Sequence, residues 1–251
     1  MNKSYFHKSF IANTVTLLNI LSGFLSLVFA SQNEFRLASI MIIAAASFDM
    51  LDGIAARVLK TSSHFGVELD SLSDVVSFGA APSFLIYKAY AYQFAGFGIL
   101  LSSCLLLFGA LRLARFNIQV DDLNEKADFK GLPIPLSAMT IATLVLSFYQ
   151  EGRIVEPFNH IVVILILVLS FLMVSKIRYN ALPKLRDKNF REKIFLFGVL
   201  LIALALAIIT NGEILFFIFL AIVLFGILRH LLLLILKKDD NFENGLKVTE
   251  N

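Results

Sequence analysis

The chain has 251 residues, of which 58% are hydrophobic and 16% are charged, and its formal net charge is +3. Soluble domains are about 45–50% apolar and about 25% charged, and a globule of this size has too little interior to hide the excess. Composition therefore excludes a soluble enzyme, a disordered chain and a nucleic-acid-binding protein. It predicts an all-α, polytopic membrane protein. The single cysteine, Cys104, excludes a disulfide framework.

Eight apolar stretches are long enough to cross about 30 Å of hydrocarbon as helices. They lie at residues 13–32, 37–59, 68–92, 95–116, 133–150, 157–175, 193–210 and 213–236. We predict a six-helix catalytic core within residues 1–180 and a C-terminal transmembrane hairpin at 190–236. Residues 237–251 are predicted to form a polar, disordered tail.

Lysine and arginine are distributed unequally among the predicted loops. If the N-terminus is cytoplasmic, all of the 22 basic residues except Arg36, Lys88 and Arg153 fall on the cytoplasmic side. Because cytoplasmic loops are enriched in basic residues, this division predicts that both termini are cytoplasmic. It also supports an even number of spans. We expect a multi-pass protein of a prokaryotic plasma (inner) membrane.

Four aspartates fall inside predicted spans, where each charged carboxylate costs roughly 3 kcal/mol. Asp49 and Asp52 share one helix face because they are three residues apart, and Asp70 and Asp74 are four residues apart on the next helix. If these two helices pack as an antiparallel hairpin, Asp49 faces Asp74 and Gly53 faces Asp70. Four carboxylates then line one cleft that opens to the cytoplasm. Carboxylate-only ligands suit Mg²⁺ or Mn²⁺, and two such ions suit a phosphoryl-type displacement.

The same region carries a spaced motif that fills every fixed position of DxxDGxxARx8GxxxDxxxD. Its residues are Asp49, Asp52, Gly53, Ala56, Arg57, Gly66, Asp70 and Asp74. This pattern resembles the signature of the CDP-alcohol phosphatidyltransferases. The resemblance implies a two-metal site, with Asp49, Asp52 and Asp70 holding one ion. Asp49, Asp70 and Asp74 would hold the other, and Asp74 would be the general base.

Further residues match positions at which this family contacts the activated lipid, CDP-diacylglycerol. Asn13 and Thr16 look like the family's NxxT element at the start of the first helix, although Ala12 stands where the family often has proline. The complete set that the resemblance implies is Asn13, Thr16, Gly53, Arg57, Ser63 and Gly66.

Longer stretches resemble the serine-accepting, integral-membrane members of the family. They are residues 68–79, 112–117, 131–135 and 173–179. The resemblance implies transfer of the phosphatidyl group from CDP-diacylglycerol to the hydroxyl of L-serine, with CMP as the second product. Serine also carries a carboxylate that needs a cation, and the candidate residues for binding it are Arg112, Arg115 and Asn117.

Other functions stay open on the sequence alone. The same chemistry with glycerol 3-phosphate, inositol phosphate or choline as acceptor is the main alternative. A cation transporter is a remote one, because intramembrane carboxylates also serve ion relays. However, the acids lie in one hairpin with no counterpart in the second half, whereas transporters usually show internal repeats. Membrane lipids are expected partners, a homodimer is left open, and no nucleic acid is expected.

Overall fold

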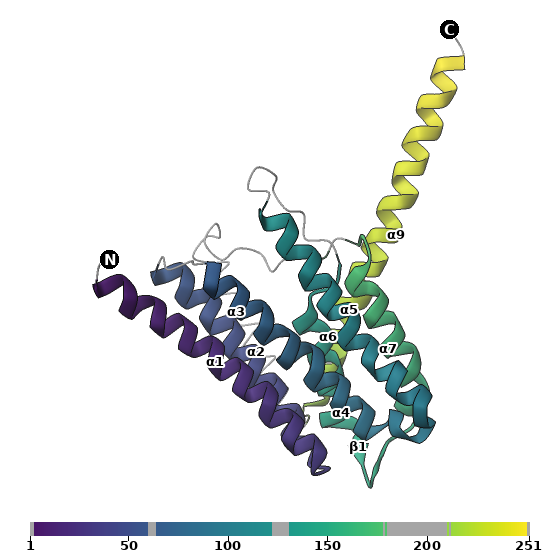
Figure 1. The fold of residues 1–251 in the computed structure, drawn as a ribbon. Coiled ribbons are helices and arrows are strands. Elements are labelled where there is room, and N and C mark those ends of the chain that lie inside the picture. Colours follow the sequence, from purple (N-terminus) through teal and green to yellow (C-terminus); the bar gives the residue numbers. More distant parts are fainter. Residues whose placement is uncertain are drawn as a thin grey trace.

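The computed structural model of the chain describes residues 3–59, 64–121, 131–177, 179, 210 and 212–249. These residues are almost entirely helical, and Figure 1 shows the helices gathered in one bundle. In chain order the elements are α1 (Lys3–Ser31), α2 (Phe35–Leu59), α3 (His64–Asp74), η1 (Val75–Ala80), α4 (Ala81–Ala89), η2 (Ala91–Phe94), α5 (Ala95–Asp121), α6 (Ile134–Phe148), β1 (Tyr149–Gln150), β2 (Arg153–Ile154), α7 (Phe158–Val174) and α9 (Glu213–Thr249). The predicted helical fold is confirmed.

Several described helices are long and apolar enough to cross a membrane. The four that meet this condition are Asn13–Ser31, Phe35–Ala55, Ala91–Ile118 and Glu213–Leu233. The helices α6 and α7 are apolar but shorter, and they coincide with two further predicted spans. A polytopic membrane protein is therefore confirmed. The count of eight spans and the orientation stay predictions, because the seventh predicted span falls almost wholly outside the described residues.

The third predicted span, residues 68–92, is a helical rod with a π-helical turn in its middle. Asp74 and Ala81 flank this turn, and both keep right-handed helical dihedral angles with φ of −60°. Pro82 stands at the start of α4. It has no N–H to donate to the carbonyl one turn earlier, which favours a widened turn at this point. The π-helical turn begins at the residue after Asp74.

The helix α1 organises the site, because it packs against α2 and also against α3, η1 and α4. Gly23 permits the close approach to η1, since a β-carbon at this position would lie 2.7 Å from the Cα of Ser77. Nearby, Ser77 Oγ donates a hydrogen bond to the backbone oxygen of Asn19 at 2.9 Å. The two helices that carry the predicted aspartates are therefore positioned relative to each other by α1.

The start of α6 is tied to the end of α7. The backbone N–H of Gly131 donates to the carbonyl oxygen of Ile177 at 2.8 Å. Gly131 has a φ of +90°, and a β-carbon there would collide with the carbonyl of Met173. Only glycine fits such a turn without strain. Two of the stretches singled out in the sequence, 131–135 and 173–179, are thus neighbours in space.

The helix α9 packs on α6 and is attached to the core by Tyr179. The Tyr179 hydroxyl donates to the carbonyl oxygen of Val223 at 3.1 Å, and its ring fills the space that a side chain at Gly226 would need. The helix then runs to Thr249, and its far end extends away from the bundle (Figure 1). The prediction of a disordered tail at 237–251 is therefore wrong up to Thr249. No proline interrupts this segment, so the helix continues.

Candidate active site

Three aspartates from two helices meet inside the bundle. Asp49 lies on α2, and Asp70 and Asp74 lie on α3. One carboxylate oxygen from each lies within 4.8 Å of the others, a spacing at which the three could hold a cation together. Asp74 is only 9% exposed, and the other two are partly buried. These residues form the aspartate cluster.

Asp52 lies beside the aspartate cluster but is not one of its three close members. It is 6% exposed, and a side-chain hydrogen bond joins it to Thr16 on α1. Its charge is within electrostatic range of Asp49, Asp70 and Asp74. The structure therefore brings all four predicted aspartates into one region, with Asp52 held against α1.

The predicted antiparallel hairpin placed Asp49 opposite Asp74 and left space between the backbones of the two helices. α2 and α3 make few close backbone approaches to each other in the described residues, whereas α1 packs along both. The helix α1 therefore supports both helices, and the carboxylate side chains of Asp49, Asp70 and Asp74 reach across the space between them. Like-charged side chains also disfavour a tight backbone contact at this level.

The predicted lipid-contacting residues are only partly described. Asn13 is half-buried on α1, Thr16 is buried beside Asp52, and Gly53 and Gly66 are both partly buried. Ser63 lies outside the described residues. The backbone of Arg57 belongs to the end of α2, but its side chain also lies outside what the structure describes. The described members of this set come from α1, α2 and α3, the three helices that surround the aspartate cluster.

The three residues predicted to bind serine have different surroundings. Arg112 on α5 is partly buried and attracts Asp74 electrostatically, and its Nε has no hydrogen-bond partner among the described residues. Arg115 instead donates from Nη1 to the carbonyl oxygen of Val174 at 3.2 Å.

Asn117 is also engaged, because its Nδ2 donates to Ser71 Oγ on α3 at 3.0 Å. Of the three candidates, Arg112 is therefore the one most available to a ligand at the aspartate cluster. Arg115 and Asn117 connect α5 to α7 and to α3.

The chemistry of the aspartate cluster suits divalent cations. Three buried oxygens have no hydrogen-bond partner among the described residues: Asp52 Oδ2, Asp70 Oδ1 and Asp74 Oδ1. Buried polar atoms are normally paired, so unpaired carboxylate oxygens at one place suit a cationic ligand. Four acids of like charge oppose one another here, with Arg112 as a nearby cation. Oxygen-only ligands of this kind are those that Mg²⁺ and Mn²⁺ prefer.

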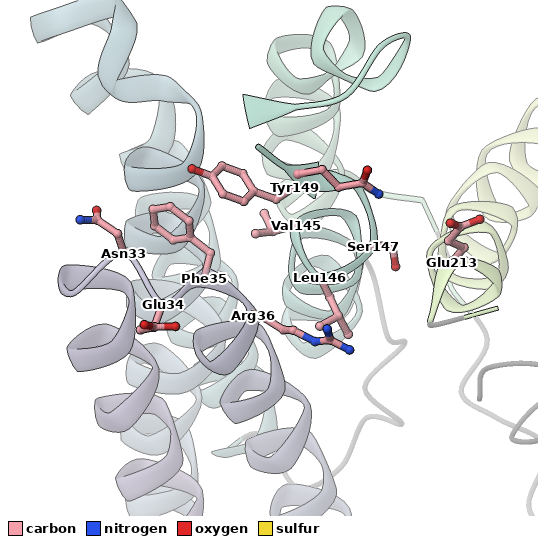
Figure 2. Close-up of a pocket in the computed structure, with 10 residues that line it drawn as sticks. Asn33, Glu34, Phe35, Arg36, Val145, Leu146, Ser147, Tyr149 and Glu213 are labelled. Carbon is pink, nitrogen blue, oxygen red and sulfur yellow. The ribbon is translucent and has the colours of Figure 1, made fainter. Parts of the chain in front are cut away.

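A second polar region, at the other end of α1 and α2, was not predicted from the sequence. The structure contains a cavity of about 470 Å³ that is lined by Glu34 and Arg36 near the α1–α2 turn, by Ser147 near the end of α6, by Gln150 of β1 and by Glu213 of α9 (Figure 2). The loop predicted between the spans 133–150 and 157–175 lies beside this cavity. It begins with a small antiparallel β-hairpin, formed by β1 and β2. None of the predicted catalytic residues lines this cavity.

A buried polar stripe on α1 also escaped the sequence analysis. Thr16, Asn19, Ser22 and Ser26 are all buried, and they follow one another at intervals of three and four residues. This spacing was visible in the sequence, because residues three and four apart share a helix face. It was not distinguishable there from the ordinary polar content of a membrane helix.

Comparison with known proteins agrees with this geometry. A family model described as CDP-alcohol phosphatidyltransferase matches residues 9–172. A CDP-diacylglycerol–serine O-phosphatidyltransferase of Helicobacter pylori is 35% identical, over 89% of this chain and 92% of the relative. A protein of the same name from Methanocaldococcus jannaschii is 40% identical, over 88% of this chain and 94% of the relative.

An archaetidylserine synthase of Methanothermobacter thermautotrophicus is 40% identical over 68% of this chain and 70% of the relative. The resemblance predicted from the spaced aspartate motif is thus confirmed over most of the chain. It extends well beyond the motif and includes the helices that surround the aspartate cluster. The chain belongs to the CDP-alcohol phosphatidyltransferase family.

Proposed function

We propose that this protein transfers the phosphatidyl group of CDP-diacylglycerol to the hydroxyl of L-serine, giving phosphatidylserine and CMP. The observation that carries the proposal is the buried aspartate cluster beside Arg112, in a chain whose relatives are named for a serine acceptor. The names of these relatives differ in the lipid but agree on serine. The names of the relatives therefore support serine as the acceptor more strongly than they support any particular lipid as the donor.

The aspartates would hold two divalent cations, Mg²⁺ or Mn²⁺. Asp49, Asp70 and Asp74 form the compact set and suit one ion. Asp49, Asp52 and Asp70 are assigned to the other, and the Asp52 oxygen without a partner is available for it. When bound, such cations would neutralise charge on the pyrophosphate of the lipid substrate and on the transferred group.

Asp74 would act as the general base. It accepts the proton of the serine hydroxyl, whose oxygen then forms a bond to the phosphorus that carries diacylglycerol. The bond from this phosphorus to CMP breaks, and the electron pair leaves with CMP. Burial of Asp74 to 9% exposure keeps bulk water away from the reacting hydroxyl. Catalysis otherwise rests on positioning the two substrates.

Arg112 would bind the serine carboxylate. In serine, the hydroxyl and the carboxylate are separated by only two carbons, so the base and the carboxylate partner must be neighbours. Asp74 and Arg112 satisfy this condition, since each contributes to the electrostatic environment of the other. Arg115 and Asn117 would then act indirectly, by holding α5 in place through their contacts with Val174 and Ser71.

The same arrangement disfavours the other acceptors. Glycerol 3-phosphate and inositol phosphate carry a phosphate with up to two charges, which is best bound by more than one cation, whereas Arg115 is engaged by a backbone carbonyl. Choline has no anionic group for Arg112 to bind. A function as a cation transporter would not explain why the chain belongs to a family of phosphatidyltransferases.

The cellular setting follows from the charge distribution. The excess of basic residues in one set of loops supports cytoplasmic termini, and therefore an active site that faces the cytoplasm of a prokaryotic plasma membrane. Membrane lipids are the natural surroundings of this site.

The decisive experiment is an acceptor assay. Purified protein is incubated with CDP-diacylglycerol, Mn²⁺ and one labelled acceptor at a time: serine, glycerol 3-phosphate, inositol phosphate or choline. We expect CMP release and a labelled lipid only with serine. Asp74→Asn should abolish turnover and largely retain nucleotide binding. Turnover of glycerol 3-phosphate without turnover of serine would refute the serine assignment, and full activity of Asp74→Asn would exclude Asp74 as the base.

A further inference from the structure

Asn19 is a buried asparagine on α1 that the proposed mechanism does not use. Its side chain is 0% exposed, and neither Nδ2 nor Oδ1 has a hydrogen-bond partner among the described residues. Leaving such a buried group unpaired costs roughly 1–3 kcal/mol. Two unpaired atoms on one buried amide therefore indicate that a polar partner meets this side chain in the working protein.

The register of α1 against α2 places Asn19 level with Asp49. These helices run antiparallel, because a short turn joins them, and the hydrogen bond between Thr16 and Asp52 fixes their register. Asn19 follows Thr16 by three residues on α1, and Asp49 precedes Asp52 by three residues on α2. In an antiparallel pair of helices these two equal steps bring Asn19 level with Asp49. Since residues three apart share a helix face, Asn19 lies on the face of α1 that carries Thr16.

The contacts of α1 with α3 and η1 place Asn19 level with Ser77, three residues beyond Asp74. Ser73 Oγ donates to the backbone oxygen of Thr16 at 3.5 Å, and Ser77 Oγ donates to that of Asn19 at 2.9 Å. Asp74 follows Ser73 in the same helix, within one turn of Ser77. Asn19 is therefore level with Asp49 and lies within one helical turn of the level of Asp74.

We propose that Asn19 is a positioning residue of the aspartate cluster. Its Nδ2–H donates a hydrogen bond to Oδ1 of Asp74 when the cluster holds its cations, and this bond fixes the orientation of the Asp74 carboxylate. Both atoms are buried and lack a partner among the described residues. A neutral amide suits this task, because it donates to a carboxylate without adding a cation that would compete with the metal ions. The inference rests on the proposed metal site.

The test compares Mn²⁺ affinity and thermal stability in purified wild type, Asn19→Leu and Ser26→Ala, with binding followed by the electron paramagnetic resonance of free Mn²⁺. Ser26 is the matched control, because it is also 0% exposed on α1 with an unpaired Oγ among the described residues, two turns beyond Asn19. We expect Asn19→Leu to bind Mn²⁺ about ten-fold more weakly, as for other groups that orient metal ligands. Its melting temperature without metal should stay equal or rise, and Ser26→Ala should bind Mn²⁺ normally.

The outcomes separate this inference from the proposed function. If wild type binds Mn²⁺ and the dissociation constant of Asn19→Leu for Mn²⁺ is within two-fold of the wild-type value, Asn19 has no positioning role. The proposed metal site would then still stand. If wild type binds no divalent cation, the metal site and the role of Asn19 both fail. Should Asn19→Leu not fold, Asn19→Ala is measured in its place, and the same thresholds apply to it.

Discussion

Neutralising Asp49 should make the metal-free protein more stable and the enzyme inactive. Asp49 lies in the aspartate cluster with Asp70 and Asp74, and Asp52 adds a further charge of the same sign. Without cations these carboxylates repel one another inside the bundle. Asparagine has nearly the same shape as aspartate and no charge, so Asp49→Asn removes the repulsion with little change in packing.

The size of the effect follows from the distance. Two unit charges 4.8 Å apart repel by about 3.5 kcal/mol at an effective dielectric constant of 20. Asp49 makes two such pairs, with Asp70 and Asp74, and proton uptake by the cluster relieves part of the repulsion. We expect a net gain of about 2 kcal/mol, which corresponds to a rise in melting temperature of about 5 °C for a chain of this length.

The measurement is thermal unfolding in detergent, first with EDTA and then with Mn²⁺. Wild type should melt at a lower temperature than Asp49→Asn in EDTA and should be stabilised by Mn²⁺, because a ligand that binds the folded state raises its stability. Asp49→Asn should gain little from Mn²⁺ and release no CMP. Glu68→Gln, an exposed acid on α3, is the control and should behave like wild type. An Asp49→Asn protein that melts below wild type in EDTA would show that repulsion does not govern this site.

Three further predictions concern the surrounding contacts. In steady-state assays, Arg112→Gln should raise the KM for serine at least ten-fold and leave the KM for CDP-diacylglycerol within two-fold of the wild-type value. Equal changes in both KM values would contradict a role of Arg112 in binding the serine carboxylate. In a double-mutant cycle, Asn117→Ala and Ser71→Ala should show a coupling of about 1 kcal/mol in stability, as for a typical hydrogen bond, and strictly additive effects would exclude this bond. Gly23→Ala should cost about 1–3 kcal/mol of stability, since its β-carbon would meet the backbone of Ser77, and an unchanged melting temperature would contradict the close packing of α1 on η1.

Much of the fold could be predicted because membrane helices obey simple rules. Hydropathy located the described spans, since about 20 apolar residues are needed to cross the bilayer. The charge of residues 237–251 was read as disorder, yet α9 continues to Thr249. A polar composition only shows that a segment is not buried, and an exposed segment can still extend a helix that packing has already started.

Contacts between distant residues could not be predicted in the same way. The sequence spacing placed Arg112, Arg115 and Asn117 together at one end of α5. Only the structure distinguishes Arg112, which faces Asp74, from Arg115, whose guanidinium donates to the carbonyl of Val174. Helix periodicity states which residues share a face, but the rotation of that face depends on every neighbour that packs against the helix.

The order of residues alone determined that this chain is a membrane protein, and it predicted that the intramembrane aspartates carry its chemistry. Apolar length, the cost of intramembrane charge and a motif of spaced aspartates are local properties, readable without coordinates. The tertiary structure decided that Asp49, Asp70 and Asp74 form the compact group, that Asp52 is hydrogen-bonded to Thr16, and that Asn19 lies level with Asp49. These outcomes depend on how α1 packs between its neighbours, and such packing is set by the shapes of many side chains at once.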